Sequence, residues 1–169
     1  MTTVLTLLLL HGVIGGLDVV WNHELIEHLP ARVEARQEEL LHAMREILFA
    51  LIFAGLAWFE WHGMLMWIIA AALAAEFGVT MRDTLLEDKI RRLTAAERTM
   101  HVILLINFGA YTALLMPEFI HWHRLPTMLQ RVDHGWRGLA LSLLAIIALS
   151  WSVRDFAAFA RLQKAAKMH

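Results

Sequence analysis

VLTLLLLHGVIGGLDVVW, residues 4–21, decides the class of this protein, because it contains only two ionisable side chains, His11 and Asp18. Its length falls within the roughly 17–25 residues that a helix needs to cross the hydrocarbon core of a bilayer. The stretch lacks the basic leading region and the small-x-small cleavage site that mark a removable signal peptide. We therefore expect a retained membrane-spanning helix here.

Four further apolar windows follow along the chain, at residues 43–61, 64–81, 102–117 and 138–153. Hydrophobic residues make up 59% of the chain and charged residues 18%, which is too apolar for an ordinary soluble domain of this length. The sequence thus predicts an all-α integral membrane bundle of five transmembrane helices in a single domain, residues 1–169. With their polar flanks, the predicted spans are about 3–28, 36–61, 63–90, 95–116 and 136–160.

Local signals set the predicted ends of two of these helices. Pro30 is expected to end the first helix, because proline disfavours helical backbone in the residue before it. Thr94 and Glu97 form a capping-box pattern that starts the fourth helix, and Pro117 is expected to end that helix. The mixture of Trp, His and Arg in residues 118–135 then predicts an interfacial segment on the outer side.

The distribution of Lys and Arg predicts the orientation of the bundle. Residues 28–46, 82–98 and 154–169 contain three, five and four of these side chains, whereas the N-terminus and the 60–63 turn contain none. Basic residues favour the cytoplasmic side of a membrane. We therefore expect an inner-membrane protein, most simply a bacterial one, with its N-terminus outside and its C-terminus in the cytoplasm.

Composition also limits the chemistry that the chain can perform. It has no cysteine, which excludes disulfides, thiolate metal sites and iron–sulfur clusters and leaves imidazoles and carboxylates as metal ligands. A net charge of −1 with dispersed basic residues argues against a nucleic-acid partner.

Each of the first four predicted helices has a stripe of polar side chains. Ionisable groups at membrane depth are costly, so their alignment on one helix face indicates a function. Spacings of three or four residues give such alignment. The stripes comprise His11, Asp18 and Asn22; Glu39, His42 and Glu46; Glu76, Thr80, Asp83 and Glu87; and Glu97, His101 and Tyr111. Because four lipid-facing stripes would be unfavourable, we expect them to face one another at the cytoplasmic end.

This order of residues resembles the ferritin-like di-iron ligand pattern, in which two helices each give a carboxylate and two give a Glu-x-x-His pair. Glu39 and His42 have that spacing, whereas Glu97 and His101 lie one residue further apart. The resemblance implies a four-helix metal site in which His42 and His101 each bind one ion and Glu39, with Glu97 or Asp83, bridges the two. The candidate ligands are His42, Glu39, His101, Asp83, Glu87, Glu24, His23, Asp18, Glu76 and Glu97.

Other polar residues admit two interpretations. The His23–His28 segment either roofs the site and donates His23 or Glu24, or is a solvated helix end. An outer set either binds a second metal or is interfacial polarity, which we prefer; it comprises Glu60, His62, Glu118, His121, His123 and His134. Solvated boundary charges are expected at Glu38, Arg45, Asp88, Lys89, Arg91 and Arg92.

The favoured functional hypothesis is a membrane oxidoreductase with a di-iron centre, acting with oxygen on a lipid, isoprenoid or quinone. Carboxylates with a minority of imidazoles suit iron or manganese better than copper, while zinc would make the same residues a hydrolytic site. We expect a soluble cytoplasmic reductase to dock at the basic 82–98 loop. The sequence carries no prediction of the oligomeric state.

Three alternatives stay open. His42 and His101 could be axial ligands of a haem b in a quinone-linked electron-transfer protein. Glu76, Asp18 and His11 could form the relay of a proton or cation carrier, although the outer half offers no matching carboxylates. The polar stripes could also serve only the packing of a structural subunit.

Overall fold

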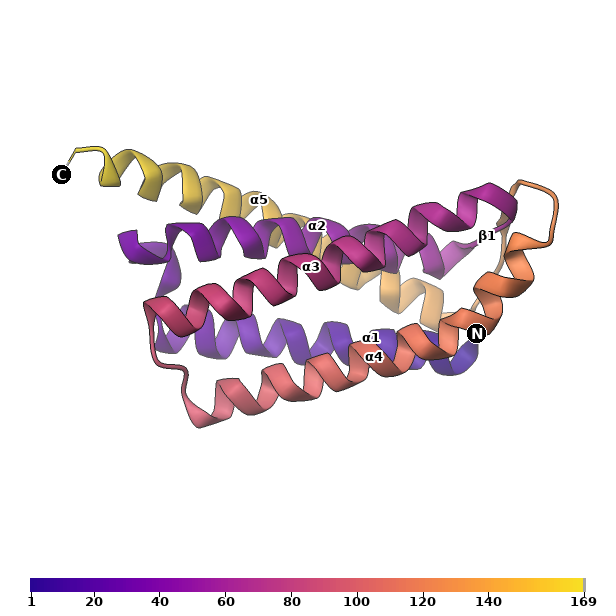
Figure 1. Cartoon of the computed structure of the whole chain (residues 1–169), viewed down its shortest axis with the longest axis horizontal. Helices are drawn as coiled ribbons and strands as arrows, with labels where there is room; N and C mark the ends of the chain where they lie inside the picture. Colours follow the sequence, from indigo (N-terminus) through magenta and orange to yellow (C-terminus); the bar gives the residue numbers. More distant parts are fainter. Residues whose placement is uncertain (169) are drawn as a thin grey trace.

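Five long helices dominate the computed structural model, which describes residues 1–168 (Figure 1). They are α1 (Thr2–Asp18), α2 (Arg36–Trp58), α3 (Met66–Ile90), α4 (Ala95–His123) and α5 (Trp136–Ala166). A π-helix, η1 (Val19–Ile26), continues α1, and the five helical segments are long and apolar enough to cross a membrane. The prediction of an all-helical chain with five such segments is confirmed over the described residues.

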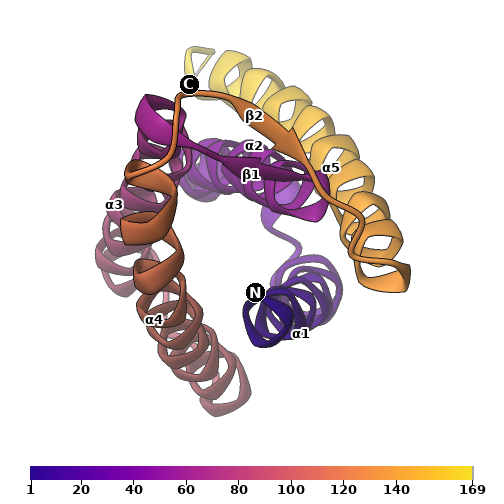
Figure 2. The same ribbon diagram turned by 90° about the vertical axis from the view of Figure 1, so that its right-hand side faces the viewer.

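The helices form two antiparallel hairpins and one added helix. The first hairpin is α1 with η1 followed by α2, joined through the short 3-10 helices η2 (Leu29–Ala31) and η3 (Val33–Ala35). The second is α3 followed by α4. Helix α2 packs chiefly against α5 and α3, and α1 packs against α4 and α5 (Figure 2). Hence η1 and α3 end, and α2 and α4 begin, at the same end of the bundle, here called the polar end.

The apolar core lies between the hairpins. Leu5, Leu8, Ile52, Leu56 and Tyr111 are almost completely buried there. Lipid tails are as apolar as leucine, so helices in a membrane gain from close van der Waals packing. Such an approach occurs at Gly12 of α1, where an added Cβ would lie 2.7 Å from Leu144 Cδ1 of α5.

Helix α4 is longer than predicted. It continues through Pro117 to His123, so the prediction that Pro117 ends this helix is wrong. Proline removes one backbone hydrogen bond, but a membrane helix tolerates it when neighbouring structure holds the chain. Here the turns beyond Pro117 bury Phe119 and the fully enclosed Trp122 in the core. Tertiary packing therefore outweighs the local signal.

A small β-sheet closes the end opposite the polar end. Strand β1 (Phe59–Trp61) pairs antiparallel with β2 (Leu129–Arg131), with Glu60 opposite Gln130. Figure 2 looks onto this end. Gly63 follows β1 with φ +58°, and a Cβ there would lie 2.7 Å from the Thr127 Cα. Only glycine fits this turn without strain. Strand β1 takes the place of the last three residues of the predicted span 36–61, because α2 ends at Trp58, and β2 lies in the segment that was predicted to be interfacial.

The change from α-helix to π-helix after Asp18 determines which side chains reach the interior. Hydrogen bonds in a π-helix join residues five apart, so side chains five apart stack on one face. Asp18 and His23 have this spacing, and both are buried, at 4% exposure each. On a regular α-helix the two would diverge. The π-helix thus turns His23 into the bundle, and His28, with φ 51°, begins the link to α2.

Candidate metal centre

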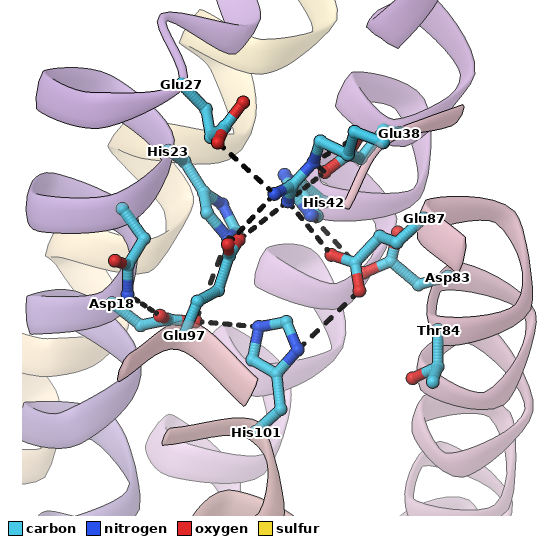
Figure 3. A network of polar contacts seen from close by, with 12 residues as sticks. Asp18, His23, Glu27, Glu38, His42, Asp83, Thr84, Glu87, Glu97 and His101 are labelled. Carbon is cyan, nitrogen blue, oxygen red and sulfur yellow. Dashed lines mark hydrogen bonds and ion pairs between the residues drawn. The ribbon is translucent and has the colours of Figure 1, made fainter. Parts of the chain in front are cut away.

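A cluster of buried ionisable side chains occupies the polar end (Figure 3). Four elements contribute to it: η1 with the end of α1, and the helices α2, α3 and α4. Glu38 and Glu97 are completely buried, and His101 is the most accessible member, with 19% of its side chain exposed. The members are Asp18, His23, Glu38, His42, Asp83, Glu87, Glu97 and His101. The expectation that polar stripes of separate helices meet is confirmed for Asp18, His42, Asp83, Glu87, Glu97 and His101.

Two sets of side chains within the cluster have the spacing of a metal site. In one set, ligand atoms of His23, Glu87, Glu97 and His101 lie within 4.8 Å of one another; in the other, so do those of Glu38, His42 and Glu87. Two donors on one ion at about 2.1 Å are at most about 4.2 Å apart. Small side-chain adjustments therefore suffice to bind a cation. Glu87 belongs to both sets, which is the position of a carboxylate shared between two ions.

The two hairpins contribute to the centre in matching ways. Glu38 and His42 at the start of α2 have the same Glu-x-x-x-His spacing as Glu97 and His101 at the start of α4. Side chains four residues apart lie on the same helix face. Thr94 caps α4 by accepting a hydrogen bond from the Glu97 backbone N–H. The Glu97 carboxylate instead turns to the cluster, so capping does not remove it from the site.

Each of these histidines is supported by an aspartate from the other hairpin. His101 Nε2 of α4 lies 3.0 Å from Asp18 Oδ2 of α1, and His42 Nε2 of α2 lies 3.3 Å from Asp83 Oδ2 of α3. Asn22 also donates to Asp18, at 2.6 Å. Carboxylates that hold imidazoles in this way fix ring orientation and strengthen them as metal ligands.

Unpartnered nitrogens show that the cluster is not complete by itself. His23 is 4% exposed, yet neither its Nδ1 nor its Nε2 has a hydrogen-bond partner among residues 1–168. His42 Nε2 also makes no hydrogen bond within the described chain, despite its proximity to Asp83. The two rings stack, with centroids 4.5 Å apart. A neutral imidazole has a lone pair on one ring nitrogen only, and His42 Nε2 already faces Asp83, so His23 is the ring whose unpartnered nitrogen is available to a cation.

Arg91, just beyond α3, crosses the cluster and contacts three of its carboxylates. Its guanidinium donates to Glu97 at 2.6 Å and to Glu38 at 2.8 Å, and Nη2 lies 3.5 Å from Glu87. Burial opposes the charge of this side chain, but the hydrogen bonds to Glu97 and Glu38 outweigh burial and raise the pKa of Arg91 above its usual range. Arg91 is therefore a fixed cation of the site.

The cluster nevertheless has an excess of negative charge. Within residues 1–168, its fixed charges are the guanidinium groups of Arg45 and Arg91 and the carboxylates of Asp18, Glu38, Asp83, Glu87 and Glu97. With neutral imidazoles and every carboxylate ionised, three negative charges would remain unbalanced. Uncompensated buried charge is strongly unfavourable. The compensation must come from protons on the imidazoles, from protons on carboxylates, or from bound cations.

The structure sorts the ten predicted ligands into three groups. Five belong to the metal-type sets: His23, His42, Glu87, Glu97 and His101. Asp18 and Asp83 lie beside the histidines of those sets. Three belong to neither set within the described residues: Glu24, which pairs with Arg154; Glu76, which accepts a hydrogen bond from Thr80; and Glu39. The carboxylate that the two sets share is Glu87, not Glu39.

Three residues in or beside the cluster were predicted as solvated charges, and that prediction is wrong. Glu38 is completely buried, the side chain of Arg91 is 3% exposed, and Arg45 donates to the buried Asp83 at 2.8 Å. Their charges pair across helices, which single-helix patterns do not reveal. The repeated Glu-x-x-x-His spacing could have identified Glu38. Asp88, Lys89 and Arg92 are exposed, as expected.

The outer polar residues do not converge in the same way. His62 lies 3.0 Å from Glu60, and Glu118 accepts a hydrogen bond from the Met1 ammonium group. His121 and His123 are exposed. Over residues 1–168, no set of three ligand-type side chains forms at that end.

Fold and cluster together define an all-helical protein with five segments suited to a membrane and a buried carboxylate–imidazole centre. No family model, curated protein or solved structure matches the chain. The function is therefore argued from the centre itself.

Proposed function

We propose that this protein is a membrane-embedded oxidoreductase whose polar end holds two metal ions, with iron as the preferred metal. The observation that carries the proposal is Glu87, whose carboxylate belongs to both sets of metal-type ligands. A shared carboxylate is typical of dinuclear centres built inside helical bundles. The five apolar helices support a site within or at the edge of a bilayer.

The chain's own residues have separate roles in this proposal. His23, Glu97 and His101 would hold one ion, Glu38 and His42 the other, and Glu87 would contact both. Such a mixture of hard carboxylates and imidazoles suits iron or manganese, with zinc as the hydrolytic alternative. When bound in reduced form, an iron pair would supply electrons to dioxygen, with oxidation of a hydrophobic substrate.

Neighbouring residues would tune this centre. Asp18 and Asp83 orient the imidazoles of His101 and His42 through the contacts described above. Arg91 offsets part of the carboxylate charge and holds Glu38 and Glu97 from two different helices. The surrounding helices keep bulk water away from a site whose members are nearly all buried.

Orientation and partners belong to the same proposal. The excess of Lys and Arg around the polar end supports its placement on the cytoplasmic side of a bacterial inner membrane. Arg82, Lys89, Arg92 and Arg98 are exposed beside the α3–α4 connection. These cations support docking of an acidic, soluble reductase there.

Elemental analysis of the detergent-solubilised full chain, with an optical spectrum, tests the proposal. Wild type should contain iron, or manganese or zinc in its place, and His42→Ala and His101→Ala should each reduce it. His121→Ala, at an exposed position on the opposite end, is the matched control. Metal-free wild-type protein from iron-supplemented cells, or equal metal in all four proteins, would overturn the proposal.

A second candidate is a proton or cation carrier. It is favoured by a cavity of about 210 Å³ between α3 and α4, whose lining includes Glu76, Asp83 and His11. These residues extend from the centre toward the middle of the bundle. Proton flux into proteoliposomes that stops in Glu76→Gln, without bound metal, would support this candidate. The haem alternative, with His42 and His101 as axial ligands, has less support, because both ring nitrogens of His101 face carboxylates, Asp18 at 3.0 Å and Glu87 at 3.5 Å.

A further inference from the structure

A second cavity adjoins the candidate metal centre between α1, α2 and α5. Its volume is about 140 Å³, and it is here called the α1–α5 cavity. Most of its lining is apolar: Phe49, Phe53, Leu104, Leu144, Ile147 and Ala148. Because liquid water occupies about 30 Å³ per molecule, the cavity has room for a short length of hydrocarbon chain.

Glycines of α1 create the cavity. At Gly12 the helix touches α5, but one turn later a Cβ added to Gly15 or Gly16 would meet no atom of the described chain within 4 Å. The two helices therefore separate just where α1 approaches the centre. Val20 and Ile147, at the edge of the cavity, are each 44% exposed. Since both lie on membrane-type helices, the opening faces the hydrocarbon of a bilayer, which admits apolar molecules.

One buried hydrogen-bond donor, Trp151 Nε1, belongs to a residue that lines the cavity and has no partner among the residues that the structure describes. An indole N–H can only donate. It therefore needs an acceptor, which the oxygen of a hydroxyl group supplies. An alkane has no such atom.

We propose that the α1–α5 cavity binds a hydrophobic alcohol, an apolar chain that enters from the bilayer and whose hydroxyl oxygen accepts a hydrogen bond from Trp151. The bound alcohol would be the substrate of the proposed oxidoreductase, and this part of the inference rests on the proposed function. His42 connects the two, because it lines the cavity and belongs to one set of metal-type ligands. The α3–α4 cavity is a poorer alternative, because it offers such a hydroxyl no unpartnered donor: among the described residues, the one buried side-chain atom of its lining residues without a partner is the acceptor Asp83 Oδ1.

Photolabelling of the solubilised full chain tests this proposal. The probe is a medium-chain primary alcohol that carries a diazirine on its chain, and adducts are located by mass spectrometry. Saturable labelling is expected at Leu144, Ile147 and Trp151. The unlabelled alcohol should compete for these sites, and the alkane of equal length should compete less well.

Two variants sharpen the test. Gly15→Leu fills the cavity and should abolish saturable labelling, whereas Gly78→Leu, at a helical glycine that is equally open but lies outside the cavity, should not. Trp151→Phe keeps an aromatic ring but removes the donor, and should weaken competition by the alcohol about fivefold, the effect of one neutral hydrogen bond. It serves as the test if Gly15→Leu fails to fold.

Three results would overturn the proposal: adducts spread evenly over the lipid-facing helices, equal competition by alkane and alcohol, or unchanged labelling in both cavity variants. Metal content measured on the same preparations separates the two proposals. Saturable labelling of metal-free protein would leave the cavity assignment standing and remove the metal centre. Bound metal without saturable labelling would leave the metal centre standing and remove the cavity assignment.

Discussion

The Arg91 guanidinium lies 2.8 Å from the Oε1 of Glu38, a carboxylate that is completely buried 53 residues earlier in the chain. The same side chain donates to Glu97 at 2.6 Å. One arginine thereby joins the starts of α2 and α4, and it holds together carboxylates that would otherwise repel one another.

Removal of this arginine should destabilise the fold. Breaking a buried ion pair by loss of one partner costs roughly 3–5 kcal/mol, because the remaining charges stay buried without compensation. Arg91→Gln should therefore lower the midpoint of thermal unfolding in detergent clearly. Arg92→Gln, at the exposed neighbouring position, should change it little. Equal midpoints for the two variants would show that Arg91 does not stabilise the cluster.

The number of ions per chain should depend on Glu87 more than on any single histidine. Wild type is expected to bind two ions, and His101→Ala should keep one, because the Glu38, His42 and Glu87 set remains intact. Glu87→Gln should lose most of both, since its carboxylate belongs to each set. Metal-to-protein ratios test this, with Glu34→Gln, at an exposed carboxylate, as control. Full occupancy in Glu87→Gln would refute a shared carboxylate.

Asp83 should matter for metal affinity without being a ligand. Removing the carboxylate beside a ligating histidine typically weakens metal binding by about 10–100-fold. Asp83→Asn should show this effect, because Asp83 lies 3.3 Å from His42, whereas Asp88→Asn, with a side chain that is 52% exposed, should not. Competition with a chelator of known affinity gives the comparison. Indistinguishable affinities would remove the role assigned to Asp83.

Withdrawal of metal should lower stability. An ion that binds only the folded chain stabilises it by about 2.7 kcal/mol when its free concentration is 100 times its Kd. A strong chelator should therefore reduce the unfolding midpoint of wild type but leave a variant lacking both His42 and His101 almost unaffected. A midpoint that does not respond to chelator in wild type would favour protonation of the cluster's own side chains as the source of charge compensation.

The turn beside the β-sheet should tolerate no side chain. Gly63→Ala places a Cβ against Thr127 at a φ that only glycine adopts freely, and should destabilise the protein by about 1–3 kcal/mol. Gly78→Ala, in the middle of α3 with open space around it, should be neutral or slightly stabilising. Thermal unfolding of the two variants gives the comparison, and a stable Gly63→Ala protein would contradict the strain argument.

Hydropathy predicted the number and approximate limits of the five helices, because each span must be apolar by itself. It missed features that depend on neighbours. The continuation of α4 past Pro117 follows from the burial of Phe119 and Trp122. The inward direction of His23 follows from the π-helix, which an ideal helical period does not include.

The sequence also predicted part of the candidate site, because the alignment of polar side chains on one face is a property of each helix by itself. The polar stripes correctly predicted that His42, Glu97 and His101, which lie on separate helices, belong to one cluster. They favoured Glu39 as a ligand and Glu38 as a solvated charge, although Glu38 is the one in a metal-type set. Both side chains lie close to the direction of His42, and the rotation of α2 in the bundle decides between them. The stripes also could not show that Arg91 folds back from the end of α3.

Each hairpin supplies an aspartate that holds a histidine of the other hairpin, so the centre forms only when both hairpins have assembled. His42 depends on Asp83, and His101 depends on Asp18, so each half of the chain supplies an imidazole whose supporting carboxylate resides in the other half. During biosynthesis, a chain with only α1 and α2 inserted would carry uncompensated acids and an unsupported ligand. Under the proposed function, only chains in which both halves have docked would bind metal. Bound metal would therefore distinguish fully assembled molecules from half-inserted ones.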